Sequence, residues 1–256
     1  MSDALRLQVA ATTRVLVMEG VLGYSGHVSA RLPAGDGTDP NAFVIQSMAA
    51  PRVGVDPGGL LTMDGAGGVR DGLGAPPLEV HIHGEIYKAR PDVRAVAHFH
   101  HDDSNLLTVV TDLAFVPMKN HACRWSDGVP VHADSSHIDT PEKGREVVAT
   151  LGGRAATLLR GHGQVLVAED VPCLLADTVH FVENVAVLLK AVGLGRPLPL
   201  TAAELGEFTA GFDRARHARK LWDYYVTSAT RAKALPESWV DGLLFGSEGS
   251  RDRLSN

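Results

Sequence analysis

The sequence predicts an α/β fold. Segments with apolar residues at helical spacing are interspersed with short β-type segments throughout the chain. Hydrophobic residues make up 45% of the chain and charged residues 21%, which is typical of globular proteins and not of disordered ones. A length of 256 residues fits one large α/β domain or two small ones.

Helices are predicted where apolar residues recur every three or four positions or where capping residues occur. Pro141 and Glu142 suit the first turn of a helix, and Thr201 with Glu204 forms a capping-box pattern. Pro91 ends the helix that begins at Glu79. The expected helices span residues 4–21, 79–89, 103–110, 141–151, 171–192 and 201–227.

Strands are predicted where short apolar or alternating runs lie between turn residues. The segment 27–32 alternates, and the runs at 43–45 and 60–63 are short and apolar. The other expected strands span residues 93–100, 156–159 and 164–167, and residues 116–118 and 129–131 could be strands as well.

Charge and cysteine content exclude several classes of protein. A net charge of −6 disfavours sequence-independent binding of nucleic acid, because phosphates would be repelled. The N-terminus lacks the basic region and cleavage site of a signal peptide, and no apolar run approaches the ~20 residues of a membrane span. Cys123 and Cys173 form no C-x-x-C pair. We therefore expect a cytoplasmic protein that binds neither nucleic acid nor membrane.

Histidines in two motifs are candidates for metal ligands. His98 and His100 stand two apart on a predicted strand, so both imidazoles point to the same face while Phe99 enters the core. His162 lies between two glycines after another predicted strand, where the backbone can turn tightly. Each motif alone is also typical of ordinary surface or turn histidines.

Glu79 begins a predicted helix that carries His83 and Tyr87 on the same face. An acidic residue at this position often only stabilises the helix dipole. Beside a metal with three histidine ligands it could instead be a general acid or base, because such a site has an open coordination position.

The order and spacing of Glu79, His98-x-His100 and Gly161-His162-Gly163 resemble the class II aldolase/adducin family. The resemblance covers roughly residues 5–225 and includes the strings EVHIHGEIYKARPDVRAVAHFHH, LLRGHGQVLVAEDV and GYSGHVSARL. It implies a single domain over residues 1–256, with a polar tail from about residue 247. The implied fold has three layers, α/β/α, around a mainly antiparallel sheet.

The resemblance also implies a site and an assembly. His98, His100 and His162 would hold one divalent metal ion per subunit, with zinc, manganese, cobalt and iron all acceptable to imidazole. Glu79 would move a proton, while the metal would stabilise negative charge on oxygen. Members of the family are usually homotetramers with active sites between subunits, to which Tyr224 or Tyr225 could contribute.

The chain departs from the sugar-phosphate aldolases of this family at the segments that bind phosphate. These segments here read Gln46-Ser47-Met48-Ala49 and Pro76-Pro77-Leu78, and proline offers no backbone N–H. His27 stands where those aldolases have asparagine. The loop containing His27 and the string with His83 are more similar to a branch that decarboxylates hydroxy-aromatic dicarboxylates, such as 3,4-dihydroxyphthalate.

The leading hypothesis is therefore a decarboxylase of an aromatic acid, acting in aromatic catabolism. Glu79, His83 and His27 are candidate proton donors. Arg52 or Arg31 could bind a substrate carboxylate. The alternatives are an aldolase on a non-phosphorylated hydroxy-carbonyl compound, an iron-dependent oxygenase, and an adducin-like interaction module without catalysis.

The remaining histidines are expected to be structural or exposed. His101 is expected to be structural or to support a ligand. We expect His180 to pack within its helix and His217 to lie on a solvated basic helix face or subunit contact. Surface loops are expected to hold His121, His132 and His137, one of which could reach the site.

Overall fold

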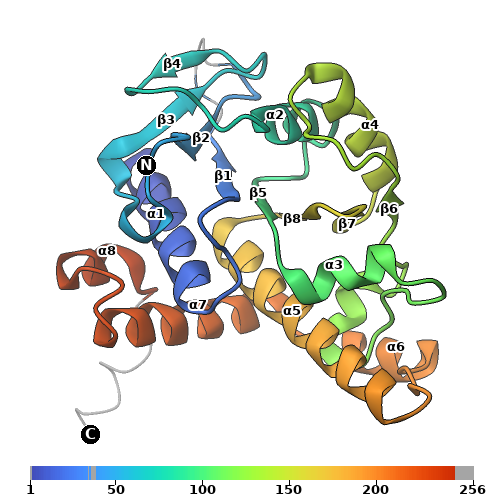
Figure 1. The fold of residues 1–256 in the computed structure, drawn as a ribbon. Coiled ribbons are helices and arrows are strands. Elements are labelled where there is room, and N and C mark those ends of the chain that lie inside the picture. The colour runs from blue at the N-terminus through green and yellow to red at the C-terminus, as the bar shows by residue number, and fades with distance from the viewer. Residues whose placement is uncertain (1, 34, 36–38, 246–256) are drawn as a thin grey trace, which may run out of the picture.

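The computed structural model describes residues 2–33, 35 and 39–245. Figure 1 shows one central sheet with helices packed on both of its faces. The helices are α1 (Ser2–Met18), α2 (Val80–Ala89), α3 (Asp102–Val109), α4 (Pro141–Leu151), α5 (Val171–Leu194), α6 (Ala202–Ala210), α7 (Arg214–Arg231) and α8 (Val240–Leu243). Short 3₁₀ helices are η1 (Arg52–Gly54), η2 (Pro57–Gly59), η3 (Asn120–Trp125) and η4 (Glu237–Trp239).

The sheet has eight strands in the order β4-β3-β2-β1-β5-β8-β7-β6. Every neighbouring pair is antiparallel except β6 with β7, which confirms the expected mainly antiparallel sheet. The strands are β1 (His27–Arg31), β2 (Phe43–Gln46), β3 (Leu60–Met63), β4 (Val69–Asp71), β5 (Ala95–Phe99), β6 (Val131–His132), β7 (Ala156–Leu159) and β8 (Gly163–Ala168).

Two hydrophobic cores, one on each face of the sheet, hold the three layers together. Side chains of α1, α5 and α7 share one core with Val28, Ala97 and Phe99 from the sheet. Side chains of α2 and α4 share the other core with Ile45 and Val96. Because successive strand residues point to opposite faces, His27 and His98 lie on the α2 face. The predicted three-layer α/β/α fold is thus confirmed.

Helix α5 is the central helix of the larger core. By length and composition it could cross a membrane, but 72% of its most apolar window is buried within the fold. Its apolar surface is therefore covered by α1, α7 and the sheet, as in the core helix of a globular domain.

Two of the expected elements are wrong. The long helix expected over residues 201–227 is two helices, α6 and α7, separated at Gly211–Asp213. Asp213 caps α7 by accepting a hydrogen bond from the Arg216 N–H, so the chain restarts a helix there. Residues 116–118 are not a strand, because their backbone binds the Asn184 side chain of α5. The expected polar tail falls on residues 246–256, outside the described residues.

Candidate metal centre and active site

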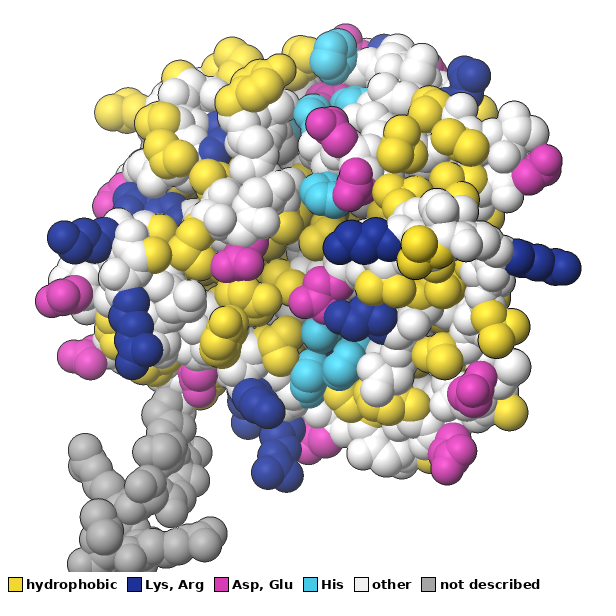
Figure 2. Space-filling model, turned by 60° about the horizontal axis from the view of Figure 1, so that its bottom comes forward, with side chains coloured by type: hydrophobic (Ala, Val, Ile, Leu, Met, Phe, Trp, Pro, Cys, Tyr) yellow, Lys and Arg dark blue, Asp and Glu magenta, His cyan; other side chains and the backbone are white. Residues whose placement is uncertain are grey.

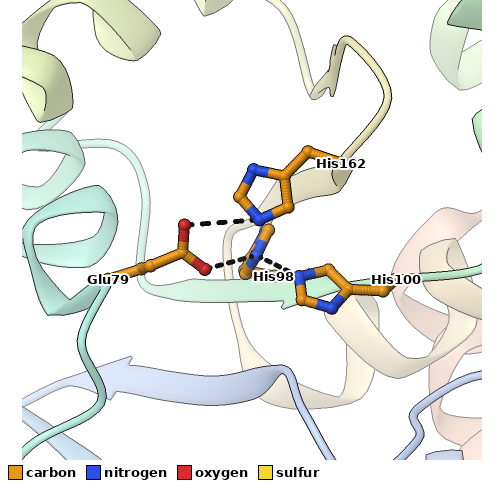
Figure 3. A group of neighbouring side chains, drawn as sticks. All are labelled: Glu79, His98, His100 and His162. Carbon is orange, nitrogen blue, oxygen red and sulfur yellow. Dashed lines mark hydrogen bonds and ion pairs between the residues drawn. The ribbon is translucent and has the colours of Figure 1, made fainter. Parts of the chain in front are cut away.

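Four side chains from three parts of the chain converge at one end of β5 (Figure 3). Glu79 caps the start of α2, His98 lies in β5, His100 follows β5, and His162 lies in the turn between β7 and β8. Their ligand atoms all lie within 4.8 Å of one another. Glu79 Oε2 is 3.2 Å from His98 Nε2, and Glu79 Oε1 is 3.3 Å from His162 Nε2. His98 Nε2 is 2.9 Å from His100 Nε2.

The turn that carries His162 depends on glycine. Gly161 has a φ of +62°, which an L side chain rarely adopts. A Cβ on Gly163 would lie 2.6 Å from both the Phe99 carbonyl oxygen and His100 Cδ2. The missing side chain at position 163 therefore allows β8 to approach β5 closely enough to bring His162 beside His98 and His100.

The hydrogen bonds of His98 fix where its proton lies. Its Nδ1 is 3.0 Å from the Gln164 carbonyl oxygen, which can only accept, so Nδ1 carries the proton. Nε2 faces the Glu79 carboxylate at 3.2 Å. A bare lone pair there would repel the carboxylate oxygen, so the contact requires either a proton on Nε2 or a cation between the two groups.

The other ligands also suit a cation. Both ring nitrogens of His162 are buried and have no hydrogen-bond partner within the described residues, and Nε2 approaches Glu79. Burial and the nearby His98 and His162 lower the pKa of His100 to about 3, so its imidazole is neutral and can coordinate. Three imidazoles and one carboxylate form a donor set that fits a divalent transition-metal ion.

Glu79 is ionised in this environment. Burial by itself would raise the pKa of Glu79, but contacts with His162 and His98 and the backbone N–H of Ile138 lower it well below the ordinary value. The Ile138 N–H donates to Glu79 Oε1 at 3.0 Å. Sequence reasoning left open which loop histidine reaches the site, and the structure places His137 Nδ1 at 3.6 Å from the same oxygen.

A chain of four buried polar groups leads away from the metal centre. His27 pairs with His98 across β1 and β5, and its Nδ1 is 2.6 Å from His83 Nε2. Ser29 Oγ is 2.6 Å from His83 Nδ1 and 2.7 Å from the Tyr87 hydroxyl. Burial lowers the pKa of both histidines, to about 3 for His83, so both rings are neutral.

The Tyr87 hydroxyl, at the buried end of this row of side chains, determines which group donates in each hydrogen bond. Among the described residues, Ser29 is the hydroxyl partner of Tyr87, so Tyr87 donates to Ser29 and Ser29 donates to His83 Nδ1. His83 Nε2 then donates to His27 Nδ1, which leaves the proton of His27 on Nε2. Both ring nitrogens of His83 are hydrogen-bonded, one to His27 and the other to Ser29. His83 can therefore influence the metal centre only through its hydrogen bond to His27.

The two arginines proposed to bind a substrate carboxylate differ in their availability. Arg31 is buried, and all five of its N–H groups donate to Val93, Pro40, Asn41, Tyr87 and Arg90. Its proposed role in substrate binding is therefore wrong, because no donor is left. Arg52 donates through Nε and Nη1 to backbone carbonyls that include Gly26, and its Nη2 makes no hydrogen bond within the described residues.

The two tyrosines named from the sequence lie on α7, and within the described residues of this chain neither contacts the metal centre. Tyr224 is 65% exposed, while Tyr225 packs against the larger core. His101 supports the site indirectly: its backbone exchanges two hydrogen bonds with the Gln164 side chain, next to the carbonyl that orients His98.

The loops at residues 46–49 and 76–78, which differ from the phosphate-binding segments of the sugar-phosphate aldolases, lie side by side next to Glu79. The backbone N–H of Met48 donates to the Ala75 carbonyl at 2.9 Å, so it is unavailable to a phosphate. Met48 and Leu78 are 55% and 54% exposed. These loops therefore offer apolar side chains beside the site, and neither Pro76 nor Pro77 has an N–H to donate.

Comparison with known proteins identifies the family. Residues 7–189 match the family described as the class II aldolase and adducin N-terminal domain. The chain belongs to this family. A class II aldolase superfamily protein from Pseudomonas syringae superposes with a TM-score of 0.78 at 22% identity, covering 90% of this chain and 94% of that one. This likeness supports the same fold.

The chain is also similar to enzymes that act on hydroxy-aromatic compounds. A 3,4-dihydroxyphthalate decarboxylase from Rhodococcus jostii is 29% identical over 213 residues, which cover 77% of this chain and 84% of the relative. A 4-hydroxy-3-prenylphenylpyruvate oxygenase/4-hydroxy-3-prenylbenzoate synthase from Streptomyces roseochromogenus is 31% identical over 144 residues, covering 52% of this chain and 50% of the relative.

Proposed function

We propose that this protein is a metal-dependent lyase that decarboxylates a hydroxy-aromatic carboxylate such as 3,4-dihydroxyphthalate. The observation that carries the proposal is the pair of loops beside Glu79, where the Met48 N–H is already bonded and the exposed side chains are apolar. Such a surface suits an aromatic ring better than a phosphate group. The relative from Rhodococcus jostii supports the same substrate class.

His98, His100 and His162 would hold the divalent ion, and its Lewis acidity would stabilise negative charge on the substrate oxygen. Glu79 is the carboxylate that lies beside the ligand histidines, and we assign it to accept the proton of the phenol and to return it to the product. The Nε2 nitrogen of His27 is not engaged by His83. After taking up a solvent proton beside the anionic substrate, the imidazolium form of His27 can donate its Nε2 proton to the ring carbon that bears the carboxylate, and the ring becomes neutral again.

The reaction balances without an oxidant. A C–H bond forms at the ring carbon, the bond from that carbon to the carboxylate breaks, and its electron pair restores the aromatic ring as carbon dioxide leaves. Solvent then returns a proton to His27. Arg52, which retains donors on Nη2, is the candidate partner for a second carboxylate of the substrate.

The test is release of carbon dioxide from 3,4-dihydroxyphthalate and related hydroxy-aromatic acids by metal-loaded protein. We expect turnover by the parent and its loss in Glu79→Gln, with metal content unchanged because three histidine ligands remain. Full activity in Glu79→Gln would contradict the proposed role of this residue.

Other activities have distinct results in the same assay. Cleavage or condensation of a non-phosphorylated hydroxy-carbonyl compound without release of carbon dioxide would indicate an aldolase. The relative from Streptomyces roseochromogenus makes an oxygenase the second candidate, and consumption of dioxygen with bound iron would support it. A chain that takes up no metal would instead fit a non-catalytic interaction module.

We also propose that the protein is a homotetramer, in which Tyr224 or Tyr225 reaches the site of a neighbouring subunit. The exposed Tyr224 is compatible with such a contact. Light scattering after size-exclusion chromatography measures the molar mass of the assembly. A monomer with full activity would contradict the proposed tetramer.

A further inference from the structure

A second group of histidines lies apart from the metal centre. Figure 2 shows histidine side chains gathered at separate places on one face, one of them among Lys, Arg and acidic side chains. His121 of η3, His180 of α5 and His217 of α7 line one cavity of about 280 Å³, together with Arg124, Asp177 and Arg214. None of these residues takes part in the proposed reaction.

The three imidazoles of this second group are in mutual contact. His180 Nε2 is 2.9 Å from His217 Nε2. The ring of His121 stacks on both, with centroid distances of 4.3 Å to His180 and 4.5 Å to His217. One ring nitrogen from each histidine lies within 4.8 Å of the others, a spacing from which they can close on a single ion.

The surroundings of His180 favour a lone pair on its Nε2, directed at the other two histidines. Its Nδ1 is buried and makes no hydrogen bond, but Glu183 Oε2 lies 3.5 Å away. A proton on Nδ1 is attracted to this carboxylate, which leaves Nε2 unprotonated towards His217. Pairs of a carboxylate and a histidine of this kind commonly orient metal-binding imidazoles. Burial lowers the pKa of all three histidines below the ordinary value.

The positively charged side chains near the three histidines form ion pairs with acidic side chains, so their charge does not exclude a metal ion. Arg214 forms short ion pairs with Glu169 and with the buried Asp177. Lys119 forms an ion pair with Glu183. The cavity leaves room for water molecules that would complete the coordination of an ion.

We propose that His121, His180 and His217 form a second metal site, which takes a borderline divalent ion such as Zn²⁺, Co²⁺ or Ni²⁺. The ion joins η3, α5 and α7, segments that are far apart in the sequence. It therefore stabilises the docking of α7, because binding to the folded state alone shifts the folding equilibrium. This site does not depend on the proposed function.

The competing explanation is that the three rings only pack. Phe208 and Phe212 contact His121, so the group could be an aromatic cluster that binds no ion. Metal binding separates the two explanations, since aromatic packing gives no stoichiometric uptake.

The experiment uses untagged protein carrying His98→Ala and His100→Ala, which disables the first site. We expect titration with Co²⁺ to give one bound ion per chain, with visible absorption of a low-symmetry Co²⁺ complex. Adding His180→Ala should abolish this ion, whereas adding His81→Ala should not, because His81 belongs to neither histidine group. Zn²⁺ should raise the melting temperature only in the proteins that retain His180.

Absence of bound Co²⁺ in the His98→Ala/His100→Ala protein would overturn the proposal. So would retention of the ion after His180→Ala. Circular dichroism checks that each variant is folded. If His180→Ala does not fold, His121→Gln with His217→Gln replaces it, because both side chains are partly exposed, and the same two outcomes apply.

Discussion

Replacing Gly163 by alanine tests how the backbone assembles the metal centre. The new Cβ would lie 2.6 Å from the Phe99 carbonyl oxygen and from His100 Cδ2, whereas ordinary contacts begin at 3.4 Å. To remove this clash, β5 and the His162 turn must move apart by about 0.8 Å. Metal–ligand distances can change by only ~0.2 Å before coordination is weakened. Overpacking of this kind also costs about 1–3 kcal/mol of folding free energy.

We therefore expect Gly163→Ala to weaken metal affinity at least about tenfold, a loss typical of changes that misorient ligands. The assay is competition with a chromophoric chelator, beside urea unfolding. Gly161→Ala is the matched control: its Cβ meets no atom within 4 Å, so only the backbone strain at φ +62° remains, about 1 kcal/mol. Parent-like metal affinity in Gly163→Ala would refute the reasoning.

Three further predictions follow from buried polar groups. Tyr87→Phe removes the donor that orients Ser29 and His83. We expect kcat to fall about fivefold with KM unchanged, because a hydrogen bond contributes ~1 kcal/mol. An unchanged kcat would contradict a role for this row of hydrogen-bonded side chains in the reaction. Arg214→Met should lower the free energy of unfolding by about 3 kcal/mol in urea titrations, because it leaves the buried Asp177 with only its longer ion pair to Arg124. A loss below about 1 kcal/mol would contradict this. The pKa of His83 is about 3 when folded, so between about pH 3 and 6.5 the unfolded chain binds a proton that the folded chain does not, and stability falls as the pH falls. His27 and His100 contribute slopes of the same sign, so His83→Gln should reduce the total slope by about 1.4 kcal/mol per pH unit, and an equal slope in the two proteins would argue otherwise.

Much of the metal centre was predictable because its signals are local. Two-residue spacing on a strand places His98 and His100 together, and glycines beside His162 indicate a tight turn. Helical spacing also placed His83 and Tyr87 on one face with Glu79. Local patterns likewise gave the bounds of α4, β3 and β7, where capping residues or turns mark both ends.

The remaining features depend on contacts between distant segments. Nothing in the sequence distinguishes Arg31, whose donors are all used, from Arg52, which keeps a free nitrogen. Nor does it bring together His121, His180 and His217, which come from three segments and were expected to be exposed or packed separately. The break between α6 and α7 has a local signal in Gly211 and Asp213, but helical spacing continues on both sides of it.

Bound metal shows directly whether His98, His100 and His162 form a metal centre. Elemental analysis compares the parent with the His98→Ala/His100→Ala variant, both saturated with Zn²⁺ and freed of excess ion. We expect the two values to differ by one ion per chain, whatever the second site holds. Equal values would contradict a metal centre built by His98, His100 and His162.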